Sequence, residues 1–118
     1  MTEKDDLTFI EHILESINAI KEFSKDTQKE ELISNRLKRS AIVREIEIIG
    51  EAVKNISESL KNKYKDVEWK EIIGTRDKMI HHYFGVDLNI IWEIIKKDLP
   101  VLEKRIKRIK KDSLQTLR

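Results

Sequence analysis

The sequence predicts an all-α fold, an antiparallel bundle of four to five helices. Apolar residues recur at steps of three and four along most of the 118-residue chain. The chain has only three glycines and one proline, and its long stretches of Glu, Lys, Ile and Leu consist of good helix formers. No segment shows the alternating pattern of a strand. This length suits one helical domain that spans residues 1–118.

The N-terminal part of the chain predicts one long and one short helix. A polar stretch, Ser24–Lys29, is expected to be a loop. Within it, Thr27 and Glu30 have the spacing of a capping box, which predicts a short helix over Glu31–Ser34. The first helix is expected from Asp5 to Phe23, on the helical spacing of Leu7, Ile10, Ile13, Leu14, Ile17 and Ile20.

The longest helix is expected from Arg36 to Leu60. A second side of it carries Ala41, Ile48 and Ala52, so the helix must be central or shared with another subunit. Gly50 lies in mid-helix, where glycine costs about 1 kcal/mol relative to alanine. We interpret it as a point of close helix packing, with a ligand contact as the alternative. The main seam consists of Ile42, Ile46, Ile49, Val53, Ile56 and Leu60.

The remaining elements are predicted from stop signals and apolar spacing. Gly74 and Thr75 could kink the helix expected over 66–84. Pro100 should start a new segment, because proline is tolerated in the first turn of a helix but not in its interior. The expected order is a polar loop over 61–65, a helix over 66–84 ended by Gly85, a helix over 88–97 capped by Asp87, and a last helix over 101–112.

The composition limits the kinds of site and partner. The chain has no cysteine, which excludes disulfides, cysteine zinc sites and thiol nucleophiles. Its 24 basic and 22 acidic residues give a net charge of +2, so any RNA binding must come from local patches. No apolar run reaches the roughly 18 residues of a membrane span, and the first residues are charged. We expect a cytoplasmic protein with no membrane contact, no metal and no cofactor.

The segment over 69–84, WKEIIGTRDKMIHHYF, places the charged side chain of Arg76 inside an apolar stripe. A guanidinium there must be paired or must line a cleft, because isolated burial costs many kcal/mol. His81 lies about 140° around the helix from Arg76, so the two share a site only through a bend near Gly74, a partner helix or a second copy. Within about 60° of Arg76 lie Trp69, Ile72, Ile73, Met79, Ile80 and Tyr83.

Arg76, His81 and Tyr83 fit the pattern Arg-x4-His-x-Tyr, and the chain here resembles the HepT-like proteins of the HEPN superfamily. Asp77 departs from the resemblance, because the family commonly has asparagine after the arginine; an acidic group there can hold Arg76 or repel phosphate. The likeness spans nearly the whole chain and includes IIGEA over 48–52, Trp69 with Ile72, and Leu99-Pro100 with Leu102.

The resemblance implies a metal-independent endoribonuclease toxin that acts as a homodimer with both motifs in one cleft. Arg76 would then stabilise charge on the phosphate, and His81 would move a proton to or from the RNA. It also implies a partner, a nucleotidyltransferase antitoxin that transfers AMP to Tyr83. Candidates for supporting roles are Asp77, His82 and Glu51.

Each candidate also has a structural interpretation. Arg76 can form an ion pair with Glu51, His81 can be a surface residue, and Tyr83 can belong to the core, as we expect of Trp69 and Trp92. The basic segment KRIKRIKK is best interpreted as a solvated helix end, with RNA contact as the alternative for Lys104, Arg105, Lys107 and Arg108.

Two other functions stay open at this point. The chain can be a non-catalytic subunit that helps a nucleotidyltransferase bind its nucleotide or substrate, or a plain dimeric scaffold. The first would leave RNA intact and still bind phosphate through Arg76, whereas the second would show neither ribonuclease activity nor nucleotide binding.

Overall fold

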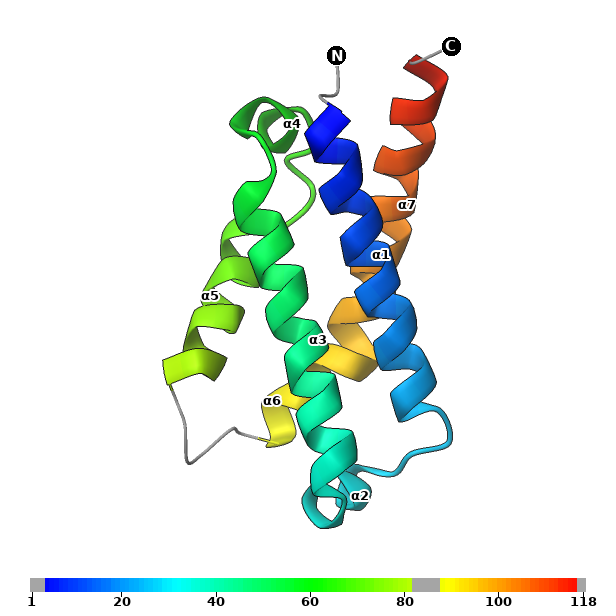
Figure 1. Cartoon of the computed structure of the whole chain (residues 1–118), viewed down its shortest axis with the longest axis vertical. Helices are drawn as coiled ribbons and strands as arrows, with labels where there is room; N and C mark the ends of the chain where they lie inside the picture. Colours follow the sequence, from blue (N-terminus) through cyan, green and yellow to red (C-terminus); the bar gives the residue numbers. More distant parts are fainter. Residues whose placement is uncertain (1–3, 82–87, 117–118) are drawn as a thin grey trace.

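The computed structural model of the chain describes residues 4–81 and 88–116, with side chains for all of these except 4, 78–81 and 116. The described residues form helices and connecting turns, which confirms the all-α fold class (Figure 1). In chain order the elements are α1 (Lys4–Ser24), α2 (Lys29–Ser34), α3 (Arg36–Asn55), α4 (Glu58–Lys63), α5 (Trp69–His81), α6 (Leu88–Glu93), the π-helical turn η1 (Ile94–Asp98) and α7 (Leu99–Thr116).

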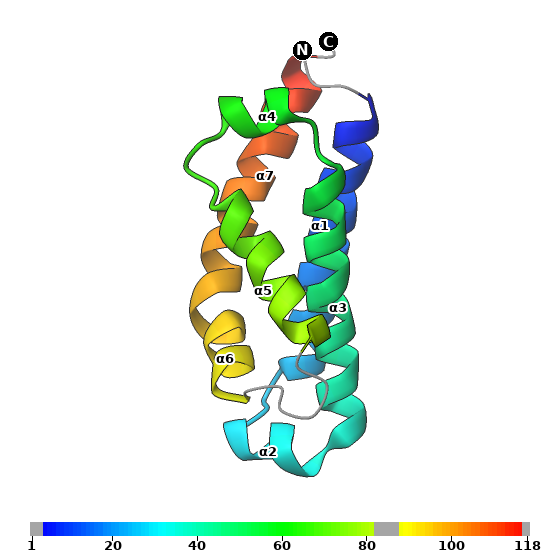
Figure 2. The same ribbon diagram turned by 90° about the vertical axis from the view of Figure 1, so that its left-hand side faces the viewer.

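The helix α1 is the centre of the bundle, because it packs against both α3 and α7. The helix α5 packs against α3 on the side away from α1. Figure 2 shows α5 between α3 and the continuous segment formed by α6, η1 and α7. Isoleucine dominates the core, and the fully enclosed side chains include Ile10, Ile13, Ile17, Ile20, Ile42, Ile91, Ile106 and Ile109. None of the described helices is long and apolar enough to cross a membrane.

The long helix expected to reach Leu60 ends at Asn55, because a tertiary contact interrupts it. The carboxylate of Asp6, which is 2% exposed, accepts hydrogen bonds from the Ser57 backbone N–H at 2.8 Å and from the Ser57 hydroxyl at 2.6 Å. The Ser57 hydroxyl in turn accepts from the backbone N–H of Leu60 at 3.2 Å and caps α4. Much of the polar loop expected over 61–65 is therefore helical.

The predicted capping box is wrong. The residue that precedes α2 is Gln28, and Thr27 is buried with its hydroxyl directed to another partner. The ammonium of Lys38 donates to the Thr27 hydroxyl at 2.9 Å and to the Glu31 carboxylate at 3.2 Å. Lys38 thus ties both Thr27 and α2 to α3. The short helix begins earlier than expected, at Lys29.

A new segment begins beside Pro100, as predicted, and it follows the preceding turn without a loop. The turn before it widens to a π-helix over Ile94–Asp98, and α7 then begins at Leu99 with the proline in its first turn. A widened turn suits a proline, which lacks an N–H and clashes with the carbonyl four residues earlier in a regular α-helix. The predicted signals at Gly85 and Asp87 lie outside the described residues.

Candidate functional site

The arginine of the motif lies at the closest approach of two helices. A methyl group added at Gly50 of α3 would overlap the Cβ and Cγ atoms of Arg76 on α5. Only a residue without a side chain therefore allows the Arg76 stem to cross α3 at this height. The predicted role of Gly50 as a point of close helix packing is confirmed.

Two carboxylates hold the guanidinium. Its NH2 atom lies 2.9 Å from Glu51 Oε2 and its NH1 atom lies 3.0 Å from Asp77 Oδ1. Lys54 adds a second cation, with Nζ 3.3 Å from Asp77 Oδ1. The hydrogen bond from Arg76 and the contact with Lys54 lower the pKa of Asp77. Two cations and two anions make up this cluster, which therefore carries no net charge.

One donor of Arg76 remains unused. The side chain is 22% exposed, yet its Nε atom is buried and has no hydrogen-bond partner among the described residues. A buried N–H without a partner costs about 1–3 kcal/mol, so the site holds a guanidinium that is not fully satisfied. The ion pair with Glu51 expected as the structural alternative is present.

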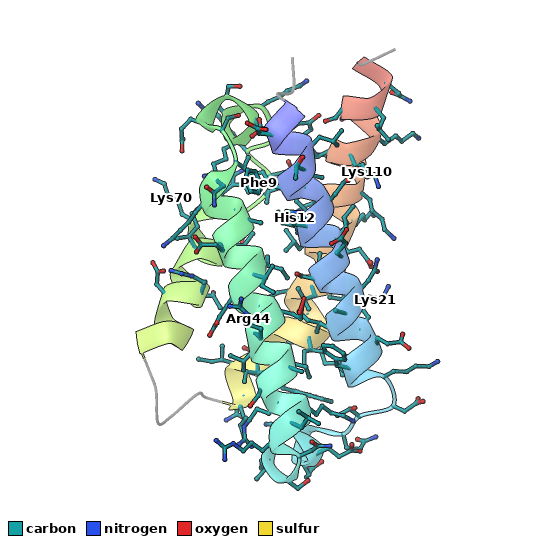
Figure 3. All side chains as sticks on the ribbon, viewed as in Figure 1. Phe9, His12, Lys21, Arg44, Lys70 and Lys110 are labelled. Carbon is teal, nitrogen blue, oxygen red and sulfur yellow. The ribbon has the colours of Figure 1, made fainter. Side chains whose placement is uncertain are left out.

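Arg76 lines an open groove between α1, α3 and α5. Figure 3 shows Phe9 and His12 on α1 and Arg44 on α3. The groove holds about 370 Å³ and is lined by Phe9, His12, Arg44, Glu47, Ile48, Glu51, Ala52, Asn55 and Arg76. Sequence analysis placed Glu51 and Arg76 together but missed Phe9, His12 and Arg44. A search for polar and aromatic residues at i, i+3 on the outer face of the first helix would have selected Phe9 and His12.

The other residues of the motif are only partly described. His81 is the last residue of α5, and its side chain is among those not described. His82 and Tyr83 lie outside the described residues. The helix runs without a break through Gly74, so the bend named as one of three ways to bring Arg76 and His81 together is absent.

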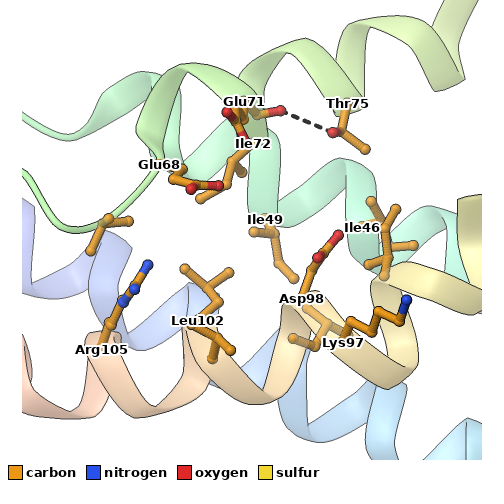
Figure 4. A pocket seen from close by; sticks show the side chains of 14 residues that line it. Ile46, Ile49, Glu68, Glu71, Ile72, Thr75, Lys97, Asp98, Leu102 and Arg105 are labelled. Atoms are coloured by element: carbon orange, nitrogen blue, oxygen red, sulfur yellow. Dashed lines mark hydrogen bonds between the residues drawn. The ribbon is translucent and has the colours of Figure 1, made fainter.

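A second cavity lies on the other side of α5, between α3, α5, η1 and α7 (Figure 4). It holds about 330 Å³, and apolar residues such as Ile49, Ile72 and Leu102 line it. Its rim includes Glu68, Glu71 and Asp98. A hydrogen bond between Glu68 and Glu71 raises the pKa of Glu71, and partial burial together with nearby carboxylates raises the pKa of Asp98. Arg76 is not among the residues that line this cavity.

The basic segment of α7 is partly neutralised. Arg108 NH2 lies 2.9 Å and Arg105 Nε lies 3.8 Å from Asp66 Oδ2, while Lys107 Nζ lies 3.7 Å from Glu103 Oε2. Arg105 lines the second cavity, whose rim includes Glu68, Glu71 and Asp98, rather than the groove of Arg76. These pairs favour the interpretation of Lys104–Lys111 as a solvated helix end. Trp69 is buried as expected, whereas Trp92 is only half-buried.

The sequence of the chain matches a known protein family. Residues 13–109 match the family described as Ribonuclease HepT-like. A Methanocaldococcus jannaschii protein, whose name combines a gamma-glutamylcyclotransferase with an RNase, is 43% identical over 106 residues. That match covers 90% of this chain and 48% of the relative, so the chain spans about half of that protein.

Two further relatives are matched over most of their length. One from Caldanaerobacter subterraneus subsp. tengcongensis, named as an RNase, is 46% identical over 86% of this chain and 90% of the relative. One from Thermococcus cleftensis, named as a ribonuclease HepT, is 37% identical over 87% of this chain and 94% of the relative. No solved structure gives a significant match.

The two helical glycines should respond in opposite ways to alanine. Gly50→Ala should destabilise the fold by about 1–3 kcal/mol, because the new methyl group forces α3 away from the Arg76 stem. Gly74→Ala is the matched control: nothing lies within 4 Å of the added Cβ, and helix propensity should stabilise by about 0.5–1 kcal/mol. Urea denaturation measures both. Equal stability of the two variants would contradict the close contact.

Proposed function

The chain belongs to the HepT-like ribonuclease family, and on this premise we propose that it is an endoribonuclease toxin that cleaves RNA with Arg76 and His81. The observation that carries the proposal is the placement of Arg76 at an open groove, with one buried donor, Nε, that has no partner among the described residues. A guanidinium that only stabilised the packing of α5 would have no need to line a groove.

Arg76 is suited to stabilise charge on a phosphate. Glu51 and Asp77 hold two of its nitrogens at 2.9 and 3.0 Å, so the planar group is fixed before RNA arrives. A fixed donor requires little reorganisation when negative charge grows on the phosphoryl oxygens in the transition state. The same carboxylates compete with the phosphate, so they orient the guanidinium at some loss of affinity.

His81 supplies the proton transfer in this proposal. Its imidazole takes the proton from a ribose 2′-OH, and the 2′-oxygen then forms a bond to the adjacent phosphorus. The bond from phosphorus to the 5′-oxygen breaks, and that oxygen takes a proton from a second histidine. The products are a 2′,3′-cyclic phosphate and a 5′-hydroxyl. No step requires a metal ion.

The second histidine comes from a second copy of the chain. His81 lies five positions after Arg76 on an unbroken helix, which places the two residues about 140° apart around its axis. A homodimer brings the histidine of one copy to the arginine of the other. The part of α3 that precedes the groove supports such an assembly, because Ala41 and Val43 remain partly exposed in the single chain.

Tyr83 is the proposed point of control by a nucleotidyltransferase antitoxin. The phenolic oxygen attacks the α-phosphorus of ATP, the bond to the β-phosphate breaks, and AMP stays on the tyrosine while pyrophosphate leaves. The added phosphate is negative and bulky, and it lies two residues from His81. It therefore repels RNA from the cleft and blocks access to it.

The chain should cut RNA with a chelator present, and Arg76→Ala or His81→Ala should each lower the rate about a hundredfold or more. Lys111→Ala is the control, since it removes an exposed cation of α7 outside the site. A cyclic-phosphate assay identifies the product, and sedimentation checks for the dimer. Full activity in either variant rejects the proposed roles. Intact RNA with retained nucleotide binding would favour the non-catalytic subunit instead.

Asp77→Asn should raise kcat/KM for RNA about two- to fivefold, the size expected from loss of one exposed ion pair. The change removes a carboxylate that competes for Arg76 and leaves the cluster with a net positive charge. Asp66→Asn is the matched control: it also removes one negative charge but frees Arg105 and Arg108 of α7. A gain of the same size in both variants would point to net charge rather than to Arg76.

Incubation with the cognate nucleotidyltransferase and ATP should add whole AMP units to the chain and abolish cleavage. Tyr83→Phe should stay unmodified and active. Tyr64→Phe is the control and should still be modified, because the Tyr64 side chain is buried and its hydroxyl donates to Asp112 at 2.9 Å. Peptide mass spectrometry locates the group. If the mass of the chain stays unchanged with a nucleotidyltransferase that demonstrably modifies another substrate, regulation by transfer of AMP to Tyr83 is excluded.

A further inference from the structure

The groove beside Arg76 has an aromatic wall that the proposed reaction does not use. Phe9 and His12 are neighbours on α1, and their rings meet edge to face, with centroids 6.0 Å apart and planes at 81° (Figure 3). His12 is exposed and Phe9 is half-buried, so both rings reach solvent. Ile48 and Ala52 of α3 add apolar surface to the same groove.

The groove also contains two guanidinium groups. Arg44 joins Arg76 in its lining, and the Arg44 side chain is 70% exposed. Its ion pair with Glu47 is long, 3.7 Å from NH1 to Oε2, and such a surface pair holds an arginine only weakly. Arg44 is therefore available for a phosphate. Aromatic rings flanked by arginines are the features with which proteins bind unpaired nucleotides.

The size of the groove suits a single nucleotide. Its volume of about 370 Å³ lies near the lower end of the roughly 300–1,000 Å³ of small-ligand pockets. A double helix is instead recognised by its shape, through rows of contacts to phosphates and 2′-hydroxyls. A short groove with an aromatic wall therefore fits one splayed base better than a duplex.

We propose that this groove binds one unpaired nucleotide next to the phosphate that is cut, with the base stacked on Phe9 and a flanking phosphate on Arg44. The inference rests on the proposed function, because it takes RNA as substrate and Arg76 as the group at the scissile phosphate. Two arginines and two glutamates, Glu47 and Glu51, line the groove, so their charges balance. Stacking rather than net attraction provides most of the binding at this point.

The test measures binding of a short fluorescent single-stranded oligoadenylate to the full chain. Phe9→Ala should weaken binding about five- to a hundredfold, and the loss should be similar at low and high salt. Arg44→Ala should weaken binding less and reduce its salt dependence. Phe23→Ala is the matched control, because Phe23 is also on α1, is 38% exposed and lies outside the groove. It should bind as the unchanged chain does.

A second variant and a cross-link guard against a folding defect. His12→Ala alters an exposed side chain and should also weaken binding. RNA that carries 4-thiouridine should cross-link to the peptide that contains Phe9 and His12. Cross-links confined to other peptides would overturn the proposal. It would also be overturned if Phe9→Ala were monomeric while His12→Ala bound RNA normally, because the groove would then be a contact between copies.

The remaining outcomes separate this proposal from the proposed function. If Phe9→Ala binds RNA as tightly as Phe23→Ala while Arg76→Ala still abolishes cleavage, the nucleotide subsite is wrong and the ribonuclease function stands. If the unchanged chain neither binds nor cuts RNA, the ribonuclease function fails and the subsite fails with it.

Discussion

The close contact of α3 with α5 at Gly50 determines where the charged residues of the site lie. Because a Cβ at this position would overlap the Arg76 stem, the absence of a side chain fixes how near the two helices come. At that spacing the guanidinium reaches Glu51, the residue next to the glycine, with 2.9 Å between NH2 and Oε2. One small residue thus determines both the packing of α5 and the first partner of its arginine.

Electroneutrality is the second constraint. Arg76 and Lys54 face Glu51 and Asp77, so a cation can lie within an apolar stripe without a large desolvation cost. The arrangement leaves little net field to attract RNA. Affinity must then come from groups around the cluster, and the groove offers aromatic and guanidinium groups for that purpose.

The fold was largely predictable because helices follow local apolar spacing, which determined α1, α3 and α7 to within a few residues except where α3 ends. The errors have tertiary causes. The end of α3 depends on Asp6, which is 51 residues from Ser57 in the chain, and the Thr27 hydroxyl, expected to cap the short helix, accepts from Lys38 instead. No local pattern reports such contacts.

The candidate site was predictable only in part, for the same reason. An arginine amid apolar neighbours showed that it needs a partner or a cleft, and Glu51 and Asp77 were both named. The groove itself joins residues of α1, α3 and α5, and its shape depends on how these helices cross. Phe9 and Arg44 belong to no motif, so only their positions in space bring them to Arg76.

The carboxylates on the far side of α5 affect how firmly this helix is attached. Glu71 and Asp98 have raised pKa values in the folded chain, so folding favours their protonated forms. Their contribution to the stability of the fold is most favourable in acid. It is lost as the pH rises through these pKa values, because the ionised carboxylates repel one another. The helix that carries Arg76 packs mainly against α3, so at neutral pH this seam holds α5 against the repulsion between the carboxylates on its other side.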